Sequence, residues 1–166
     1  PGAGMRRREL LGGAGGLAAL AGVPGVWGRQ VDPGPYSPLG RVAVEGATEA
    51  VVGDDGTTAY VAASTGFASV DVSDPAEPAV LAERRDLLAD REGGPMTGIF
   101  DVKVEGDRLL VAGPANHDDE VPNGVAVYDV ADPADPRLVA FHATDHHVHN
   151  CFLHEGLAYF PQGRGN

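Results

Sequence analysis

Residues 66–78 read GFASVDVSDPAEP and residues 124–136 read GVAVYDVADPADP, so one pattern of small and β-branched residues occurs twice. In both copies the pattern ends in an Asp-Pro step followed by a second proline, which is typical of a turn. Agreement at so many positions is not expected by chance, and a fixed repeat indicates a fold built from similar units. The repeat therefore decides how the rest of the chain is divided.

Two further strands are predicted before each copy, and another such pair begins near residue 150. The segments are short, rich in Val, Ala, Tyr and Leu, and separated by Gly, Asp and Pro. Each unit then has four strands in about 50 residues, the length and layout of a propeller blade. The predicted pairs are 49–52 with 57–63, 101–104 with 108–112, and 150–153 with 157–160.

We therefore predict an all-β fold, a truncated β-propeller of four-stranded meander blades with about two and a half blades present. Because propellers close with about four to eight blades, we expect a fragment of a longer protein. The predicted parts are an export signal at 1–28, a linker at 29–47 that can supply an outer strand to a preceding or closing blade, blade 1 at 48–97, blade 2 at 98–148 and a partial blade 3 at 149–166.

The third strand of each unit reads FASVD at residues 67–71 and VAVYD at residues 125–129, and an Asp-Pro-x-x-Pro tail follows. These segments resemble the LVIVD repeat family, whose name describes this strand. Ser69 and Tyr128 depart from its aliphatic pattern. The resemblance covers roughly residues 49–166 and implies a β-propeller, often exported and often of undefined biochemistry.

The N-terminal segment has the layout of an export signal. Arg7 and Arg8 precede Leu10 and Leu11, and an apolar stretch diluted by glycines runs to Val26. This order resembles a twin-arginine signal and predicts an extracellular or cell-surface location. The glycines and a proline make a poor spanning helix, so no transmembrane anchor is predicted.

The charge balance is strongly acidic, with 24 acidic against 12 basic residues and a formal net charge of -12. Lys103 is the only lysine. Such a surface stays hydrated in concentrated salt, so we predict a halophilic, haloarchaeal source. The same charge argues against a nucleic-acid partner. Cys151 is the only cysteine, which excludes an intrachain disulfide.

The meander layout sorts the connections between two faces of the blades. The enlarged connections 83–98, 113–123 and 145–149 fall on one face, where binding groups are usually displayed. Polar residues also begin each predicted inner strand and would ring the mouth of a central channel. The candidate binding residues are Glu49, Asp101 and Asn150 at the strand starts, with Asn116, His117 and Asp118 in the loop.

A second hypothesis concerns metal binding, because five of the six histidines fall between His142 and His154. Imidazole is the commonest transition-metal ligand among side chains. The candidate ligands are Asp145, His146, His147 and His149. The alternative is that these histidines are ordinary polar residues of a solvated loop. No cofactor is certain, and a transition metal ion is the one that the pattern suggests.

Catalytic signatures are sparse. His154-Glu155 begins like a zincin motif, but position 158 is alanine. No Gly-x-Ser-x-Gly elbow occurs. The sequence therefore favours a non-catalytic scaffold that binds an envelope protein, a glycan or a small ligand. The alternatives are a metal-dependent extracellular enzyme and a purely architectural envelope module.

Overall fold

The computed structural model describes residues 37–114 and 120–161. The chain divides into two compact units, Pro1–Ser37 and Pro38–Asn166, and all the strands described here belong to the second. The described residues form ten β-strands and no helix. None of them therefore forms a helix long and apolar enough to cross a membrane.

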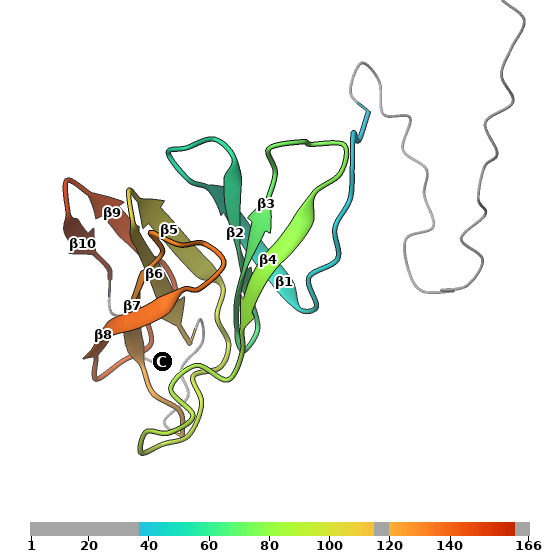
Figure 1. The fold of residues 1–166 in the computed structure, drawn as a ribbon. Helices are drawn as coiled ribbons and strands as arrows, with labels where there is room; N and C mark the ends of the chain where they lie inside the picture. Colours follow the sequence, from blue (N-terminus) through green and yellow to red (C-terminus); the bar gives the residue numbers. More distant parts are fainter. Residues whose placement is uncertain (1–36, 115–119, 162–166) are drawn as a thin grey trace, which may run out of the picture. The chain divides into compact units, whose positions relative to one another are not determined.

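The first blade is a four-stranded antiparallel meander in chain order (Figure 1). Its strands are β1 Ala47–Val52, β2 Thr58–Ala63, β3 Gly66–Asp71 and β4 Ala79–Arg84. The strands are rich in alanine and valine, which suit a pleated and half-buried surface, and Asp-Gly, Thr-Gly and Asp-Pro steps lie between them.

The second blade repeats this meander in a sheet of its own. Its strands are β5 Asp101–Glu105, β6 Arg108–Gly113, β7 Gly124–Asp129 and β8 Arg137–Ala143. A third sheet contains only β9 Phe152–His154 and β10 Leu157–Tyr159. The all-β propeller-blade prediction is confirmed. The last strand pair is shorter than the predicted 150–153 and 157–160, because residues 150 and 151 are still part of the incoming connection.

The two complete blades share an irregularity as well as an order. The register of β3 against β4 shifts between Ser69 and Val70. The register of β7 against β8 shifts between Val127 and Tyr128, the equivalent pair of residues in the repeat. A bulge bends a strand and strengthens its local twist. The repeated sequence thus encodes blade curvature as well as strand order.

Apolar side chains fill the spaces on both sides of blade 2. The first cluster joins residues of blades 1 and 2 and includes Tyr60, Ala62, Phe67, Val102, Leu109, Val111, Ala126 and Tyr128. The Phe67 and Tyr128 rings meet edge to face with centroids 4.9 Å apart. The second cluster joins Leu110, Ala112 and Val125 of blade 2 to Val148 and Cys151. Blades therefore stack face to face, and each interface is a hydrophobic core.

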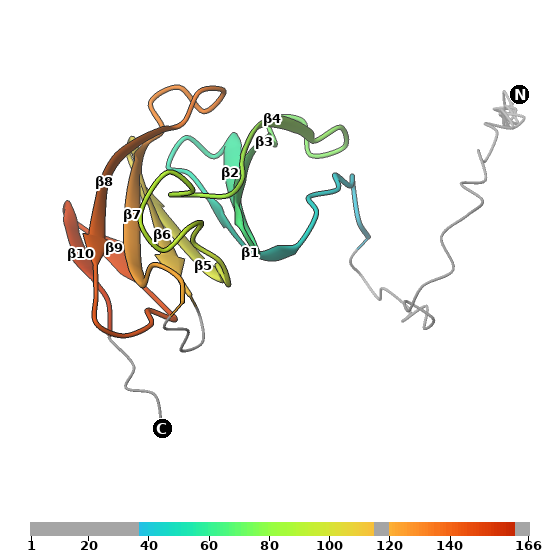
Figure 2. The same ribbon diagram turned by 90° about the horizontal axis from the view of Figure 1, so that it is seen from below.

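The first strands of the three sheets are neighbours, since β5 contacts both β1 and β9. Figure 2 shows the same sheets from below, with β5 between β1 and β9. Adjacent first strands are what a radial array of blades requires. Residues that begin these strands are consequently brought together, and the turns after β1 and β5 lie side by side.

Candidate functional site

The aspartates of the repeated Asp-x-x-Asp-Pro segments form hydrogen bonds with the backbone of their own turns. Each side chain accepts a hydrogen bond from the backbone N–H two residues ahead, at 2.9–3.0 Å; the residues are Asp71, Asp74, Asp129 and Asp132. This Asx geometry fixes the turn between the last two strands of each blade. The prediction that the repeated Asp-Pro steps form turns is confirmed.

Glu49 and Asp101, two of the predicted channel-mouth residues, are brought together by Lys103. The Lys103 ammonium donates to Glu49 Oε1 at 2.9 Å and also to Asp101. Each carboxylate additionally accepts a backbone N–H from the following blade, Glu49 from Val102 at 3.1 Å and Asp101 from Cys151. These acids therefore connect neighbouring blades.

Burial and mutual contact set the protonation of this cluster. Burial, followed by the contact with Asp101, raises the pKa of Glu49. Burial opposes ionisation of Asp101 too, but its hydrogen bonds with Glu49 and Lys103 hold the pKa of Asp101 below its ordinary value. Burial likewise opposes the charge of Lys103, and its two carboxylate partners raise its pKa nonetheless. The cluster thus keeps Lys103 charged and makes Glu49 the carboxylate that takes up a proton first.

Asn150, the third predicted channel-mouth residue, is exposed and lies next to the buried Cys151. Burial, with the nearby Asp101 carboxylate, raises the pKa of the Cys151 thiol. A protonated thiol is a poor nucleophile. Cys151 therefore acts as a small core residue, packed with Leu110 and Val125.

A second layer of carboxylates connects the blades at the opposite ends of the inner strands. Asp54 Oδ2 accepts the Gly106 N–H at 2.9 Å. Glu105 accepts the N–H groups of Glu155 and Gly156, each at 2.8 Å. Charged acceptors make strong hydrogen bonds with backbone N–H groups. Part of the acidic composition is thus used to hold one blade against the next.

The predicted metal ligands lie in the connection between β8 and β9. His146 and His147 are half-buried, whereas Asp145 and His149 are exposed. The His149 ring stacks near Phe100 with centroids 6.4 Å apart. Within residues 37–114 and 120–161, no three His, Cys, Asp or Glu side chains are grouped so that they could hold a metal ion. The metal hypothesis gains no support from this geometry.

Asn116, His117 and Asp118 of the connection between β6 and β7 lie outside the described residues. The described end of this connection contacts the segment between β4 and β5. A Cβ placed on Gly93 would lie 3.6 Å from the Pro122 side chain. Two of the enlarged connections are therefore in contact on one face of the blades, as the meander layout predicts.

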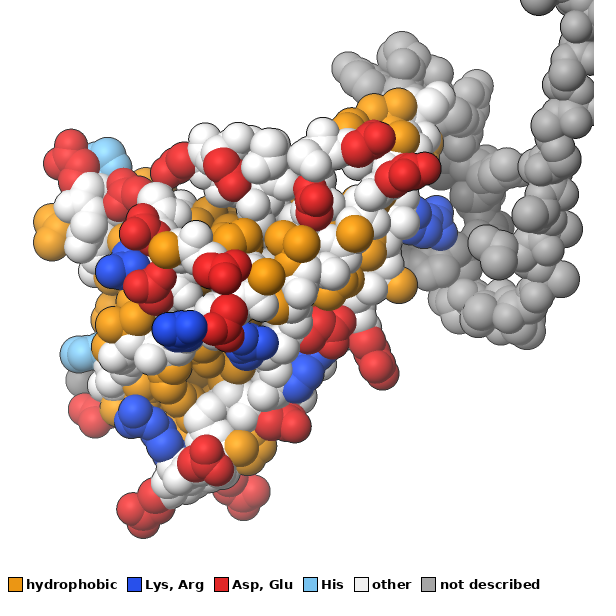
Figure 3. Space-filling view, in the orientation of Figure 1, with side chains coloured by type: hydrophobic (Ala, Val, Ile, Leu, Met, Phe, Trp, Pro, Cys, Tyr) orange, Lys and Arg blue, Asp and Glu red, His pale blue; other side chains and the backbone are white. Residues whose placement is uncertain are grey.

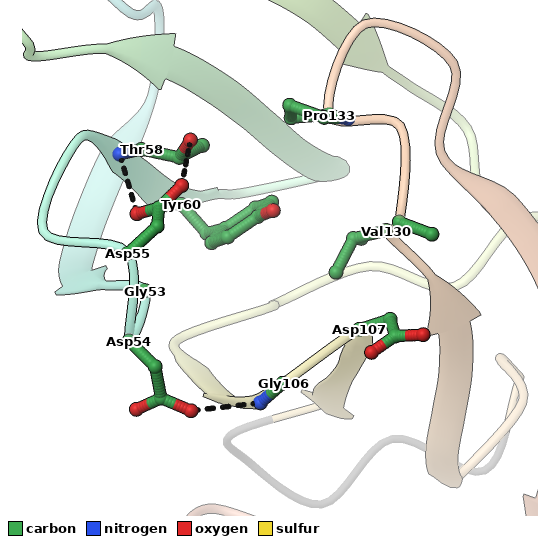
Figure 4. Close-up of a pocket in the computed structure, with 10 residues that line it drawn as sticks. Gly53, Asp54, Asp55, Thr58, Tyr60, Gly106, Asp107, Val130 and Pro133 are labelled. Carbon is green, nitrogen blue, oxygen red and sulfur yellow. Dashed lines mark hydrogen bonds between the residues drawn. The ribbon is translucent and has the colours of Figure 1, made fainter.

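A cleft on the other face was not anticipated. It has a volume of about 350 Å³ and opens between the first turn of blade 1 and the turns of blade 2 (Figure 4). Its lining residues are Gly53, Asp54, Asp55, Thr58, Tyr60, Gly106, Asp107, Val130, Ala131 and Pro133. The sequence predicted binding groups on the opposite face, among the enlarged connections. A possible signal was the pair of aspartates at 54 and 55, which makes this turn longer than its counterpart in blade 2.

Asp55 holds the blade 1 side of the cleft in shape. Its carboxylate accepts the Thr57 and Thr58 N–H groups at 2.8 and 2.9 Å and the Thr58 hydroxyl at 2.8 Å. These hydrogen bonds, the Thr57 N–H first, lower the pKa of Asp55 to about 2. Asp55 therefore remains charged across the ordinary pH range and gives this wall of the cleft a fixed negative charge.

The fold and its blade-to-blade connections define the class of protein: an all-β chain of propeller blades, joined by apolar cores and carboxylate links. Residues 55–84, which include β2, β3 and β4, match the LVIVD repeat family. The match supports the repeat family that residues 67–71 resemble. The chain matches none of the curated proteins and none of the solved structures with which it was compared.

Proposed function

We propose that this chain is an exported, extracellular or cell-surface binding scaffold built from LVIVD-type propeller blades. Its partner would be an envelope protein, a glycan or a small ligand. The scaffold part of the proposal is supported by the repeat match and by the stacked blades. Because propellers host both binding and catalysis, the binding role needs separate support.

One observation carries the binding role: the long connection between β4 and β5 is built into the core. Its side chains Leu87, Leu88, Met96 and Ile99 are at most 8 % exposed and pack in the cluster between the blades. The Ile99 N–H also donates to the Ser64 carbonyl at 3.3 Å. Because these buried side chains already fix the loop, binding a partner costs less conformational entropy.

The exposed part of this connection is therefore displayed on a fixed base. Successive turn hydrogen bonds join Ala89 to Asp86 and Arg91 to Leu88, at 3.1 and 2.9 Å. The Arg91 guanidinium lies over the Phe141 ring of blade 2, 5.7 Å from its centroid. Both blades thus hold the segment, which presents the exposed Asp90 and Glu92 to a partner.

Export and a halophilic setting are supported by sequence. The Arg7-Arg8 pair and the following diluted apolar stretch are the basis for export. The net charge of -12 is the basis for a concentrated-salt environment. Acidic side chains are scattered over the face seen in Figure 3, with fewer basic ones among them. Replacing Arg7 and Arg8 by lysine is expected to retain the protein in the cytoplasm, as measured by cell fractionation.

The binding role is tested by adding the labelled chain to intact cells of the source organism. We expect saturable binding that unlabelled chain displaces. The double variant Asp90→Ala, Glu92→Ala is expected to bind roughly fivefold more weakly, because a few displayed side chains supply most of the binding energy. Glu77→Ala, on the exposed turn between β3 and β4, is the matched control. Binding that is linear in concentration would rule out a specific partner.

A metal-dependent extracellular enzyme was the alternative from sequence. It would require ligands to converge on one ion, and the described residues do not bring three such side chains together. No observation in the described part of the chain favours it, and we do not propose it.

A further inference from the structure

Each complete blade has one apolar face that the following sheet covers. We call it the forward face, and the opposite one the backward face. The forward face of blade 1 includes Tyr60 and Phe67, which are at most 4 % exposed because blade 2 packs on them. The forward face of blade 2 includes Leu110 and Val125, at most 2 % exposed, and the third sheet and the segment before it pack there. In both interfaces of the chain a forward face therefore meets a backward face.

The third sheet, formed by β9 and β10, has a forward face as well, and it is exposed. Phe152 pairs with Tyr159 as Lys103 pairs with Leu110 in blade 2, so Tyr159 takes the place of the buried Leu110. Leu157 is two residues from Tyr159 and lies on the same face. Phe152, Tyr159 and Leu157 are 57, 52 and 59 % exposed, and a hollow of about 600 Å³ lies beside the two rings. Exposed aromatic groups of this kind are typical of protein interfaces.

The backward face of blade 1 is the second uncovered face. The register places Val52 where blade 2 has Val104, and Ala50 where blade 2 has Val102. Val102 is fully buried and Val104 packs against the core between the blades. In contrast, Ala50 is exposed and Val52 is 59 % exposed. Figures 1 and 2 show blade 1 and the third sheet at the two ends of the row of sheets. The two ends thus present one face of each kind.

A polar link also repeats along the inner strands. Glu49 accepts the Val102 N–H and Asp101 accepts the Cys151 N–H, so one inner-strand residue of each blade is joined to the backbone that follows. Asn150 holds the same position in the third sheet and is exposed. Its side-chain amide oxygen is a hydrogen-bond acceptor, as the two carboxylates are. The third sheet therefore carries both the apolar and the polar groups of a forward face.

We propose that the forward face of the third sheet binds the backward face of blade 1 in a second copy of this chain. Phe152 and Tyr159 of one copy pack on Val52 of the other, and Asn150 accepts the N–H of Ala50. A second copy is the occupant because it supplies the backward face that both interfaces within the chain use. Large side chains at one end then meet small ones at the other.

Two copies joined in this way close into a ring. Each copy brings three sheets, so a pair has six, and propellers close with about four to eight blades. The pair contains the same contact twice and leaves neither end face exposed. Closure matters because a head-to-tail contact that does not close forms an open filament. Each copy also carries a net charge of -12, so the copies repel each other unless salt screens them.

The test is sedimentation equilibrium of the full chain over a range of concentrations. In about 2 M NaCl we expect a mass that rises to twice the 17.1 kDa of the chain and then stays constant. In about 0.15 M NaCl the dissociation constant is expected to be at least roughly tenfold higher, because screening is weaker. A monomer at every concentration in high salt overturns the inference. A mass that keeps rising beyond the pair overturns the closed arrangement.

Charge substitutions at the two ends test the faces. Phe152→Glu and Val52→Glu are each expected to raise the dissociation constant at least roughly thirtyfold, because an unpaired carboxylate is then buried in the contact. Asn150→Ala is expected to raise it about fivefold. Val139→Glu is the matched control: Val139 is 57 % exposed on β8 and belongs to neither end face, so the change should be below about threefold. Circular dichroism and urea midpoints check that each variant is folded.

Mixing the two charged variants distinguishes this arrangement from a symmetric contact between two third sheets. Phe152→Glu keeps an intact backward face and Val52→Glu keeps an intact forward face. Each alone should be a monomer at a concentration at which their equal mixture forms pairs. If Val52→Glu alone pairs as well as the unchanged chain, two forward faces meet each other and the inference is overturned. A mixture that stays monomeric also overturns it.

This inference goes beyond the proposed cell-surface role and does not rest on it. The double variant Asp90→Ala, Glu92→Ala should leave the pair intact, because neither residue belongs to an end face. Saturable binding to cells by a chain that never pairs would refute the pairing alone. Pairing with the expected variant effects, without saturable binding to cells, would refute the cell-surface role alone.

Discussion

Blade 1 and blade 2 are two copies of one repeat, and the positions at which they differ are more informative than the positions at which they agree. Both use the same Asx turns and the same bulge, and in both a carboxylate of the inner strand accepts a backbone N–H from the next blade. They differ at Tyr60 against Leu110 and at Ser69 against Val127. The features that repeat are needed to form a blade. The residues that differ between the copies serve one particular interface.

The unrepeated residues gather where blade 1 meets blade 2. Ser69 is fully buried and donates to the Pro133 carbonyl in the turn of blade 2. Arg84 donates to the Pro136 carbonyl at 3.0 Å and pairs with Asp135 at 2.9 Å. These polar contacts dock the blade 2 turn onto blade 1. The corresponding face of blade 2 is apolar at Val127, so the two interfaces of blade 2 are chemically different.

The largest effect is expected from Phe67→Ala, which breaks the apolar contact at this interface. Phe67 is fully buried and packs edge to face on Tyr128. Removing the ring is expected to cost about 3–4 kcal/mol of unfolding free energy, as lost burial and a residual cavity. Urea unfolding followed by circular dichroism measures it. The exposed Val139→Ala is the control and should change stability by less than about 0.5 kcal/mol.

A loss for Phe67→Ala no larger than that of Val139→Ala would show that the blades do not stack through this ring in solution. An unchanged m-value would show that the variant still unfolds as one unit, as expected if both blades share a core.

A smaller loss of stability is expected from Lys103→Met, which tests the charged cluster of Glu49, Asp101 and Lys103. In blade 1 the position equivalent to Lys103 is Val51. The variant leaves Glu49 and Asp101 facing each other without a cation. We expect a loss of about 2 kcal/mol at pH 7, below the full cost of breaking a buried pair, because Glu49 and Lys103 reach solvent. Urea unfolding at fixed ionic strength measures it.

The pH dependence of this loss has a definite sign. The pKa of Glu49 is raised above its ordinary 4.5 in the folded protein, so a proton on Glu49 stabilises the fold as the pH falls. The pKa of Asp101 is below its ordinary 3.8, so its charged form is retained until the solution is more acidic. Neutral Glu49 no longer repels Asp101, and the cost of Lys103→Met should shrink from pH 7 toward pH 4.5. A cost that grows instead would contradict the assignment.

The sequence was sufficient to predict the blades because the signal is local and repeated. The strand composition, the Asp-Pro turns and the spacing of residues 66–78 and 124–136 each act within one blade. The inner-strand acids Glu49 and Asp101 were also found, but as a channel mouth. Their use as links depends on backbone N–H groups at least 50 positions away, which no local pattern reveals.

The cleft could not be predicted for the same reason. Tyr60 was one aromatic residue in a strand, and it lines a cleft only because Val130 and Pro133 of blade 2 are placed near it. The metal-ligand hypothesis for Asp145, His146, His147 and His149 came from their closeness in sequence. No three His, Cys, Asp or Glu side chains are grouped within the described residues, so it stays a prediction.

A still smaller loss of unfolding free energy is expected from Ser69→Ala. The substitution removes the hydroxyl of the fully buried Ser69, which donates to the Pro133 carbonyl in a partly buried contact. The expected loss is about 1 kcal/mol, the net contribution of one hydrogen bond. Thermal or urea unfolding measures it. Thr48→Ala, which removes a partly buried hydroxyl donor to the Ile99 carbonyl at 3.1 Å, is the matched comparison and should cost less.

The smallest effects are expected from the repeated turns, and a double-mutant cycle makes them informative. Asp74→Ala and Asp132→Ala each remove one Asx hydrogen bond of 2.9 Å and should each cost about 1 kcal/mol. The two turns differ in that only the blade 2 turn is held by Ser69. Asp132→Ala combined with Ser69→Ala should therefore show a coupling of at least about 0.5 kcal/mol, because both act on the position of the Pro133 carbonyl. Asp74→Ala combined with Ser69→Ala should be additive within about 0.5 kcal/mol. Equal coupling in both cycles would mean that the turn is not docked on blade 1, and the distinction between repeated scaffold and unrepeated interface residues would not hold.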